Sequence, residues 1–565
     1  MLQKIATCEY LSLDTESLGP SLPTRDKFLN VYASTVLGFS FCLPDKTSYY
    51  CPVSHPVKNV SEEHVRKILQ AMQGKRVVFH NAKHDLRVLS QQYGSLSSYD
   101  AEDTLILAWL NGEEKKGLKS LAKSRLGRES PEFKALDLAT PEETAFYACS
   151  DALNTLELYD YYLARTPPEI LEEYRTYELP FIRVLLDMEN AGMRYDVTAS
   201  RRLRKTLEAA VRKLYAEWDQ HMPLISPTSG AQLQALFTEG LWATGNVTPS
   251  GLYSTDHKTM KDIANTAEGL GKRLAEIRVE LSEYNKLISG FMSPLEDLAA
   301  VYQDGRIHPS YGQTGTATGR LSCNTPNLMN IPAHGENGKL LKSCFVPAEG
   351  KIFVSADYSQ IELRVLAHFC GGSLAQAYKR GADVHQETAD SVGCSRQQGK
   401  TLVFATVYGA GNNKVAELLG ESRDVGNRFI KKFKDSRPEV FRLKRDIIRA
   451  ASDRDPPYVR TLLGRRRYLE DMGSWGDQAK AFNTVIQGGA ADICKLAMLL
   501  LHKELGAEAT MISQVHDEIT LEVPNTSEAI DHYTRTLTRC MKDAYKLNVP
   551  IEVDAKEALS WDKTK

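Results

Sequence analysis

Near the middle of the chain runs Lys351-Ile352-Phe353-Val354-Ser355-Ala356-Asp357, an apolar stretch that ends in an acid. It predicts a strand, and the spacing of residues 358–366 predicts a helix directly after it. Residues 511–515 and 519–523 predict two further strands, joined by the tight turn His516-Asp517-Glu518. An isolated Asp at a strand end is usually only a turn residue. Two such acids on neighbouring strands can instead hold two divalent ions about 4 Å apart for phosphoryl transfer.

A predicted helix between these strands carries Arg396, Lys400, Phe404 and Tyr408, which are spaced four residues apart and form one slowly winding stripe. The two cations can grip a triphosphate while the rings face a sugar and a base. An ordinary amphipathic helix with its aromatic residues in the core stays open as the simpler interpretation. The overlapping segment 393–401 resembles a phosphate-binding loop, but five residues separate its glycines where that loop has four, and a predicted helix precedes it. We therefore reject that interpretation.

A second group of acids lies near the N-terminus. Asp14 and Glu16 are separated by one residue at the end of the predicted strand 11–16, so both carboxylates can point to the same side. Asp85 follows an apolar run, and Tyr147 and Asp151 are one helical turn apart. Four acids can bind two metal ions, with Tyr147 orienting the attacking water. Taken singly, each fragment is more often mere packing.

Composition limits the class of protein without naming a function. A length of 565 residues predicts several domains, and 42% hydrophobic with 25% charged residues is typical of a globular chain. The net charge of -2 means that phosphate binding must come from local clusters of Lys and Arg. Ten cysteines without a Cys-x-x-Cys pair predict buried thiols in a reducing compartment. We expect neither a signal peptide nor a membrane span, and we expect a domain boundary at the paired prolines Pro167 and Pro168.

Together, three segments resemble motifs A, B and C of family A DNA polymerases: 357–364, 396–409 and 514–518. Five further segments fit the same family: 318–322, 326–328, 383–385, 461–467 and 487–492. Residues 5–162 resemble the tyrosine variety of DEDD-type proofreading exonucleases, and because the four acids and the tyrosine are all present, the resemblance implies an active exonuclease.

The resemblance implies an α/β multidomain chain, in which an RNase H-like 3′–5′ exonuclease domain (1–165) precedes a right-hand polymerase domain (170–565). Its thumb would span about 197–300, its palm about 301–370 and 480–565, and its fingers about 371–479. The short distance from Met1 to Asp14 leaves no room for a 5′ nuclease domain, and 225–300 shows no large insertion. We therefore expect a phage replicative enzyme in the cytoplasm of a bacterial host.

The resemblance also assigns roles. In the polymerase the catalytic residues would be Asp357, Asp517, Glu518 and Lys400, with Asp357, Tyr358 and Asp517 at the metal. The incoming dNTP would meet Arg396, Lys400, Phe404, Tyr408, His385, Glu362 and Gln360. The primer–template would meet Arg320, Asn483, Gln487, His516 and Gln514. In the exonuclease Asp14, Glu16, Asp85 and Asp151 would hold metal beside Tyr147.

The resemblance also implies several details of these roles. By the family pattern, Lys400 is expected to protonate the leaving pyrophosphate, a role that suits a cation where negative charge develops. Glu362 is expected to exclude a 2′-hydroxyl, and Phe404 to discriminate against chain terminators. Each active site would use two Mg²⁺ ions, with Mn²⁺ as an open alternative. The expected partners are primer–template DNA, dNTPs, a single-stranded 3′ end, and replisome proteins such as a helicase and a single-strand-binding protein.

Departures from the family pattern leave some contacts open. Met329 stands where many relatives have Gln, and His334 and Ala479 stand where many have Arg. Val403 and Ala405 replace the usual Asn and Gly. The alternatives are a duplex-binding accessory protein and a stand-alone exonuclease with an inactive polymerase site. Intact acids argue against the first, and some 400 further residues argue against the second. Glu362 favours deoxynucleotides over the substrates of an RNA polymerase.

Overall fold

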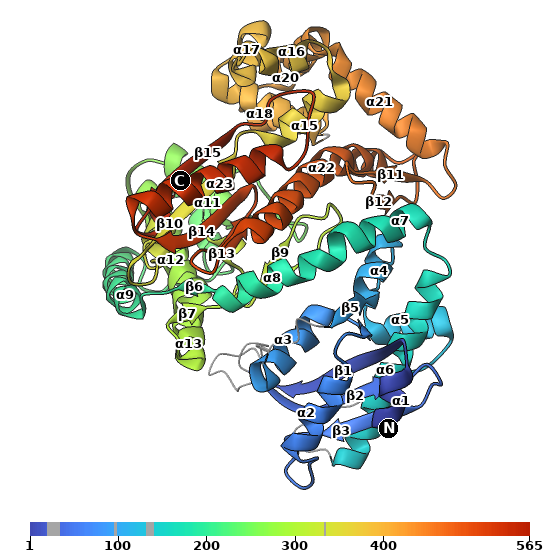
Figure 1. The fold of residues 1–565 in the computed structure, drawn as a ribbon. Coiled ribbons are helices and arrows are strands. Elements are labelled where there is room, and N and C mark those ends of the chain that lie inside the picture. The colour runs from blue at the N-terminus through green and yellow to red at the C-terminus, as the bar shows by residue number, and fades with distance from the viewer. Residues whose placement is uncertain (20–33, 95–98, 132–139, 333–334, 409, 565) are drawn as a thin grey trace.

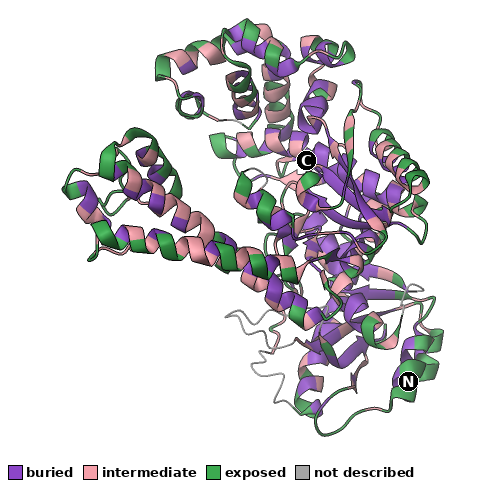
Figure 2. Cartoon of the chain, turned by 90° about the vertical axis from the view of Figure 1, so that its left-hand side faces the viewer, coloured by how far each residue is buried: buried purple, intermediate pink, exposed green. Residues whose placement is uncertain are grey.

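The computed structural model describes residues 1–19, 34–94, 99–131, 140–332, 335–408 and 410–564. These residues form a smaller N-terminal body and a larger body (Figure 1). The larger body carries a projecting arm, seen best in Figure 2, and an upper helical cluster. Separate buried apolar cores lie in the N-terminal body, in the larger body and in the arm.

The N-terminal body is built on a five-stranded mixed sheet in the order β3-β2-β1-β4-β5. Its strands are β1 (Tyr10–Leu18), β2 (Thr35–Cys42), β3 (Ser48–Pro52), β4 (Arg76–Phe79) and β5 (Asp100–Asp103). Its helices are α1 (Leu2–Thr7), α2 (Glu62–Ala71), α3 (Ala82–Tyr93), α4 (Thr104–Leu110), α5 (Leu118–Leu126) and α6 (Pro141–Leu163). β1 pairs antiparallel with β2 and parallel with β4, so it lies at the centre of the sheet.

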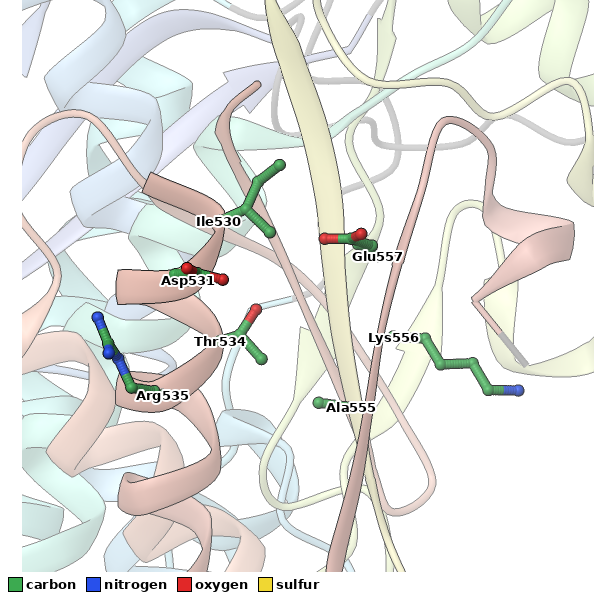
Figure 3. A pocket seen from close by; sticks show the side chains of 7 residues that line it. All are labelled: Ile530, Asp531, Thr534, Arg535, Ala555, Lys556 and Glu557. Carbon is green, nitrogen blue, oxygen red and sulfur yellow. The ribbon is translucent and has the colours of Figure 1, made fainter. Parts of the chain in front are cut away.

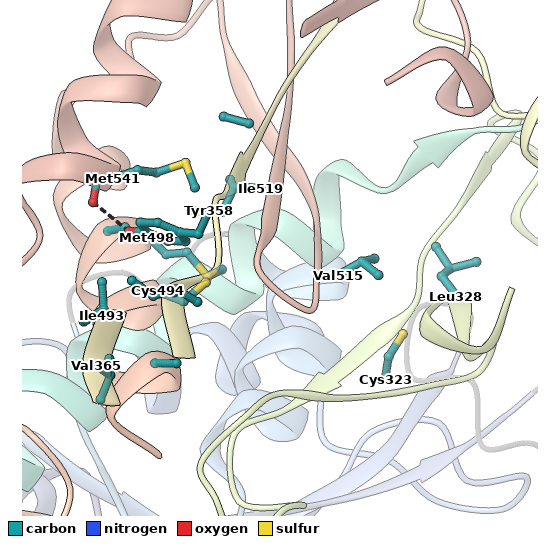
Figure 4. Close-up of a cluster of buried hydrophobic side chains, with 14 of the residues drawn as sticks. Cys323, Leu328, Tyr358, Val365, Ile493, Cys494, Met498, Val515, Ile519 and Met541 are labelled. Carbon is teal, nitrogen blue, oxygen red and sulfur yellow. Dashed lines mark hydrogen bonds between the residues drawn. The ribbon is translucent and has the colours of Figure 1, made fainter. Parts of the chain in front are cut away.

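The larger body is built on an antiparallel sheet in the order β13-β14-β10-β15. Its strands are β10 (Lys351–Tyr358), β13 (Thr510–Val515), β14 (Glu518–Pro524) and β15 (Val553–Ala558). Helices α14 (Glu336–Lys342), α15 (Ile361–Cys370), α22 (Trp475–Glu504) and α23 (Ser527–Asp543) accompany it. Side chains from the strands, α22 and α23 meet in the core shown in Figure 4, where the Tyr358 hydroxyl donates to the Met541 carbonyl at 2.8 Å.

Among the described helices, α22 is the one long and apolar enough to cross a membrane. However, 83% of its apolar window is buried inside the fold, which is the usual position of a core helix.

The arm and the upper cluster are helical. The arm comprises α9 (Val197–His221), α10 (Gln234–Thr238), α11 (His257–Thr266) and α12 (Gly269–Leu287), and a π-helical turn (Ile288–Met292) leads on to α13 (Ser293–Tyr302). The upper cluster comprises α16 (Gly372–Lys379), α17 (Val384–Val392), α18 (Arg396–Val407), α19 (Asn412–Leu419), α20 (Arg423–Ser436) and α21 (Pro438–Ser452). Short strand pairs join β6 (Met193–Arg194) to β7 (Arg306–Ile307), β8 (Ser310–Gly312) to β9 (Ser322–Asn324), and β11 (Tyr458–Arg460) to β12 (Arg466–Tyr468).

The two bodies are joined by α7 (Pro168–Glu173), a π-helical turn (Tyr174–Glu178) and α8 (Leu179–Ala191). Helix α8 contributes to both cores: Phe181 and Leu185 pack in the larger body, whereas Ile182 and Leu186 pack in the N-terminal body. One amphipathic helix therefore forms part of both hydrophobic cores.

A buried ionic group lies where α3, α8 and β8 meet. The carboxylate of Glu189 on α8 pairs with Lys83 and with Arg87 Nη1 at 2.8 Å, both on α3. It also accepts the backbone N–H of Tyr311 at 2.6 Å. Glu189 is 0% exposed. These contacts fix the N-terminal body against the larger one through a charge that is fully removed from water.

Candidate active sites

In the larger body, Asp357 and Asp517 lie at neighbouring strand ends, as predicted. Asp357 is near the end of β10, and Asp517 lies in the turn between β13 and β14. The N–H of Tyr358 donates to the Asp517 carbonyl at 3.2 Å, which joins the strand end to the turn. The thiol of Cys494 beneath them has its pKa raised to about 12 by burial, and the charges of both Asp517 and Asp357 contribute to the shift. Both carboxylates are therefore close to one point in the structure.

The predicted turn is wrong in one respect. It consists of His516 and Asp517 alone, because Glu518 already pairs with Asp357 and with Val515 as the first residue of β14. Glu518 is 2% exposed, and its carboxylate accepts from the Ser355 hydroxyl at 2.8 Å. Residues directly opposite on paired strands share one face of the sheet. Glu518 is thus a buried neighbour of Asp357 rather than an acid at the hairpin tip.

A polar network leads from this turn to the upper cluster. Arg320 Nη2 lies 3.9 Å from Asp517 Oδ1 and also pairs with Glu362 on α15. The Tyr408 hydroxyl donates to the other oxygen of Glu362 and also interacts with Gln487. Asn483 donates to the Tyr408 carbonyl at 3.4 Å. These residues from four separate segments form one continuous wall beside Asp517.

The first three residues of the predicted stripe lie on α18, and the fourth, Tyr408, directly follows the last residue of that helix. Phe404 and Tyr408 are stacked with ring centroids 5.9 Å apart, and His385 of α17 lies 5.8 Å from Phe404. Burial lowers the pKa of His385 to about 4, with Arg396 and Lys400 adding to the shift, so the imidazole is neutral at pH 7. Arg396 is exposed and pairs with Asp383 at 2.8 Å. The structure therefore brings the cations, the rings and His385 together.

Three other predicted residues are held by the protein itself. Gln360 precedes α15 with φ 55° and accepts from the Tyr378 hydroxyl at 2.9 Å. Tyr358 directs its ring into the core, so only its backbone lies at the strand end. Gln514 is 5% exposed, and its amide donates to the His516 carbonyl. Gln514 thus supports the turn from beneath.

The departures from the family pattern can be placed in part. Helix α18 is continuous through Val403 and Ala405, which are 3% and 5% exposed and pack in the core. Met329 lines a cavity of about 280 Å³ with His516, Asn330 and Trp561. His334 and Gly409, the last residue of the predicted motif B, lie outside the described residues.

In the N-terminal body, three elements bring the predicted acids together. Asp14 and Glu16 alternate along β1 on the face of Ser12, whose hydroxyl donates to the Ala152 carbonyl of α6 at 2.6 Å. Asp85 comes from α3 and accepts the N–H and hydroxyl of Thr15 at 2.9 and 2.6 Å. Tyr147 and Asp151 come from α6, the helix that Ser12 contacts.

The electrostatics show that these carboxylates share one site. Burial raises the pKa of Asp14 well above its usual range, and the charges of Asp85, Glu16 and Asp151 raise it further. Burial and the charges of Asp151 and Asp85 likewise raise the pKa of Glu16 to about 8. Burial raises the pKa of Asp85 to about 7, although hydrogen bonds from Thr15 oppose the shift. The site therefore concentrates negative charge that nearby protein cations only partly neutralise.

Two residues near this site were not predicted from the sequence. Lys119 Nζ, at the start of α5, lies 4.8 Å from the centroid of the Tyr147 ring, and its charge lowers the pKa of Glu16 and Asp151. Asp103 accepts the backbone N–H groups of Asn81 and Ala82 at 3.1 and 2.8 Å, which fixes the start of the helix that carries Asp85. Lys119 belongs to a basic stretch that looks like a solvated surface, so the sequence carried no signal for it.

The donor set of the N-terminal site fits a hard divalent cation, since carboxylate oxygens are the ligands that Mg²⁺ prefers. Within the described residues Asp151 Oδ1 is buried and has no hydrogen-bond partner. In the same residues, no three His, Cys, Asp or Glu side chains are grouped closely enough to be ligands of one ion. The fit therefore rests on the kind of donor and on the uncompensated charge rather than on a formed coordination shell.

Comparisons with known proteins agree with this division of the chain. Residues 197–563 match the family model "DNA polymerase family A", and residues 1–165 match the model "3'-5' exonuclease". The DNA polymerase I of Chloroflexus aurantiacus is 32% identical over 587 residues, which cover 95% of this chain and 60% of the relative. The thermostable DNA polymerase I of Thermus aquaticus is 34% identical over 410 residues, which cover 69% of this chain and 48% of the relative.

A solved structure resembles the whole chain. The POL domain of Pol1 from M. smegmatis, in complex with DNA primer–template and dNTP, superposes with a TM-score of 0.85 at 26% identity. The match covers 100% of this chain and 98% of that one. By contrast, this chain spans 60% of the length of the Chloroflexus polymerase and 48% of the Thermus one.

Proposed function

The chain belongs to DNA polymerase family A, and from this premise we propose that it adds deoxynucleotides to a primer 3′ end under the direction of a template. We propose further that the N-terminal body removes mispaired nucleotides as a 3′–5′ exonuclease. One observation carries the proposal: two sites, one in each body, each bring acids from separate elements together with residues suited to a phosphate substrate.

In the polymerase site, Asp357 and Asp517 would hold the divalent ions. Bound Mg²⁺ would neutralise the phosphates and favour ionisation of the attacking 3′-hydroxyl. Arg396 and Lys400 lie on α18, the helix that leads to Tyr408 beside Glu362, and they would bind the triphosphate. Lys400 would give a proton to the leaving pyrophosphate. The surroundings of His385 support this assignment, because the charges of Arg396 and Lys400 both lower the pKa of its imidazole.

Substrate selection would follow from the wall beside Asp517. Glu362 is held from two sides by Arg320 and Tyr408, so its position is fixed. A carboxylate fixed in this way would exclude a 2′-hydroxyl by contact. The stacked rings of Phe404 and Tyr408 would form the surface that contacts the new base pair and selects for correct pairing by shape.

In the exonuclease site, Asp14, Glu16, Asp85 and Asp151 would hold the metal ions, and Tyr147 would orient the attacking water. Lys119 would stabilise negative charge at the scissile phosphate, because it is a cation beside that tyrosine. Tyr147 keeps its proton at neutral pH, since burial and the Asp151 charge raise its pKa. It therefore acts as a hydrogen-bond donor and not as a base.

The right-hand arrangement expected from the resemblance stays a proposal for this chain. We propose the arm as the thumb, the four-stranded sheet with its helices as the palm, and the upper cluster as the fingers. The M. smegmatis relative solved with primer–template DNA and dNTP supports these partners. Phage replication, the cytoplasm of a bacterial host and replisome partners stay predictions, since the relatives named above are bacterial.

The test uses a 5′-labelled primer on a longer template with Mg²⁺, with and without dNTPs. We expect the unmodified chain to extend the primer with dNTPs and to shorten it without them. Asp357→Ala should only shorten it, and Asp14→Ala should only extend it. Asp531→Ala, which makes the same change on the exposed face of α23, serves as the control and should do both. If the unmodified chain binds the duplex but does neither, it is an accessory protein and the proposal fails.

A further inference from the structure

Helix α21 lies next to the β11–β12 hairpin (Figure 1), and both elements carry several arginines. This arginine band consists of Arg442, Arg445 and Arg449 on α21, Arg454 after it, and Arg460 and Arg466 on the hairpin. The three on α21 are exposed and spaced three and four residues apart, so they share one side of the helix. Residues 442–468 contain nine Lys and Arg against three Asp. The segment is therefore locally basic in a chain whose overall charge is close to zero.

Aromatic rings lie within the band. The Tyr458 ring has Arg454 and Arg466 over it, each 4.5 Å from its centroid, and Arg460 at 5.6 Å. Tyr468 pairs with it across the hairpin at 5.8 Å, and both rings are partly exposed. Hydrogen bonding from Arg460 and the charge of the guanidinium groups lower the pKa of Tyr458 despite some burial. The hairpin thus presents rings within a field of positive charge.

The nearby carboxylates do not neutralise the band. Arg449 lies 3.3 Å from Asp446, and Arg460 and Arg466 share the single carboxylate of Glu169. Among the described residues no ion pair involves Arg442, Arg445 or Arg454. Asp453 and Asp455 are exposed beside them, and they leave the band with more cations than anions.

We propose that the arginine band binds single-stranded DNA. Guanidinium groups at helical spacing along α21 would contact successive phosphates, and unpaired bases would stack on Tyr458 and Tyr468. Rings interleaved with arginines favour a nucleic acid over an acidic protein segment, which would need the charge alone. The proposal rests on the proposed function in one respect: the strand bound here would be the unpaired template ahead of the polymerase site.

A surface pocket elsewhere in the larger body has cations but lacks the excess positive charge and the aromatic rings of the arginine band. The pocket between α23 and β15 has a volume of about 630 Å³ and exposes Arg535 and Lys556 (Figure 3). Asp531 and Glu557 line the same pocket, and it contains no aromatic ring. Alternating charges of this kind would repel as much phosphate as they attract. The exposed cations of this region therefore provide a control with the same number of charges removed.

The experiment measures binding of the full chain by fluorescence anisotropy in EDTA, so that neither catalytic site acts. The probes are hairpin duplexes with a recessed 3′ end and a 5′ overhang of about 2 or about 15 thymidines. The short overhang is below and the long one near the upper end of the usual range of site sizes, about 4–16 nucleotides. The readout is the ratio of the two dissociation constants, which isolates the contribution of the overhang. The variants are Arg442→Ala/Arg445→Ala/Arg449→Ala, Tyr458→Leu and Tyr458→Phe, and the control is Arg535→Ala/Lys542→Ala/Lys546→Ala. Thermal unfolding checks that each variant folds.

We expect the unmodified chain to bind the long overhang about tenfold more tightly, as stacking of one or two bases implies. The triple arginine variant should lose most of this ratio, and the salt dependence of the long-overhang constant should weaken by about 2 in log–log slope. Tyr458→Leu should lose part of the ratio, while Tyr458→Phe and the control keep it.

Three results would overturn the proposal. The first is an equal ratio in all variants, and the second is a loss that is the same for both overhangs, which would assign the band to the duplex. The third is an unchanged ratio together with lost binding of a polyglutamate peptide, which would make the band a protein-docking surface. Primer extension is measured separately: a chain that fails to extend but shows the overhang effect refutes the proposed function and not this site.

Discussion

Replacing Glu189 with alanine is expected to destabilise the junction between the two bodies strongly. The side chains of Glu189, Arg87 and Lys83 are 1%, 3% and 14% exposed, so removal of the carboxylate leaves two cations that cannot regain full hydration. Breaking a buried ion pair on one side costs about 3–5 kcal/mol. The backbone N–H of Tyr311 also loses its acceptor, which places the expected loss toward the upper end of that range.

Urea unfolding followed by tryptophan fluorescence measures this loss. Trp109 is a suitable reporter because it lies between the bodies, with Arg465 at 5.0 Å and Lys495 at 5.6 Å from its ring. The first transition is the one to compare, since a chain of several domains need not unfold in a single step. Glu504→Ala is the matched control, because its ion pair with Arg539 lies on the surface, where such pairs contribute little.

A second variant tests whether the loss comes from leaving buried charges without a partner. Replacing Lys83 and Arg87 with Met and Glu189 with Leu removes all three charges at once, and we expect it to recover most of the lost stability. The reasoning is refuted if Glu189→Ala shifts the first transition no further than Glu504→Ala does.

Three other predictions concern single residues. Phe404→Tyr should increase incorporation of dideoxynucleotides in a primer-extension assay, with ordinary extension as the control; equal incorporation contradicts the assigned role. Lys119→Ala should slow removal of a 3′ nucleotide by about 100-fold, while Lys119→Arg retains most of the rate and both extend primers normally. An unchanged exonuclease rate in Lys119→Ala would show that the lysine is only a surface cation. Burial and the charges of Glu178 and Asp492 raise the pKa of Glu173 from 4.5 to about 9. Because the folded state binds this proton more tightly than the unfolded state, the protonated carboxyl adds to the free energy of unfolding. This addition is complete below pH 4.5 and is lost as the pH rises toward 9, by at most about 1.4 kcal/mol per pH unit. Urea unfolding from pH 5 to 9 should therefore show a flatter profile for Glu173→Gln, and parallel profiles would contradict the shift.

Sequence reasoning succeeded where the signal was local. The strand before Asp357 and the stripe on α18 follow from spacing within a dozen residues. It failed at Glu518, because the pairing of β14 with two strands draws that residue out of the turn. Contacts between distant segments carry no such pattern: Lys83 and Glu189 are 106 residues apart. The ionic junction and the place of Lys119 beside Tyr147 therefore become visible only in the folded chain.

Helix α8 has a consequence for the timing of error correction. Since Phe181 and Ile182 anchor the same helix in two cores, the distance between the two candidate sites is fixed by the fold. Under the proposed function, a misplaced nucleotide would reach the second site by separation of the primer from its template. Each base-pair step opened costs about 1.4 kcal/mol, and a mismatched end has less to lose. Accuracy would then depend on the rate of melting relative to the rate of the next addition, and the packing of α8 in both cores would set how much of the strand must melt.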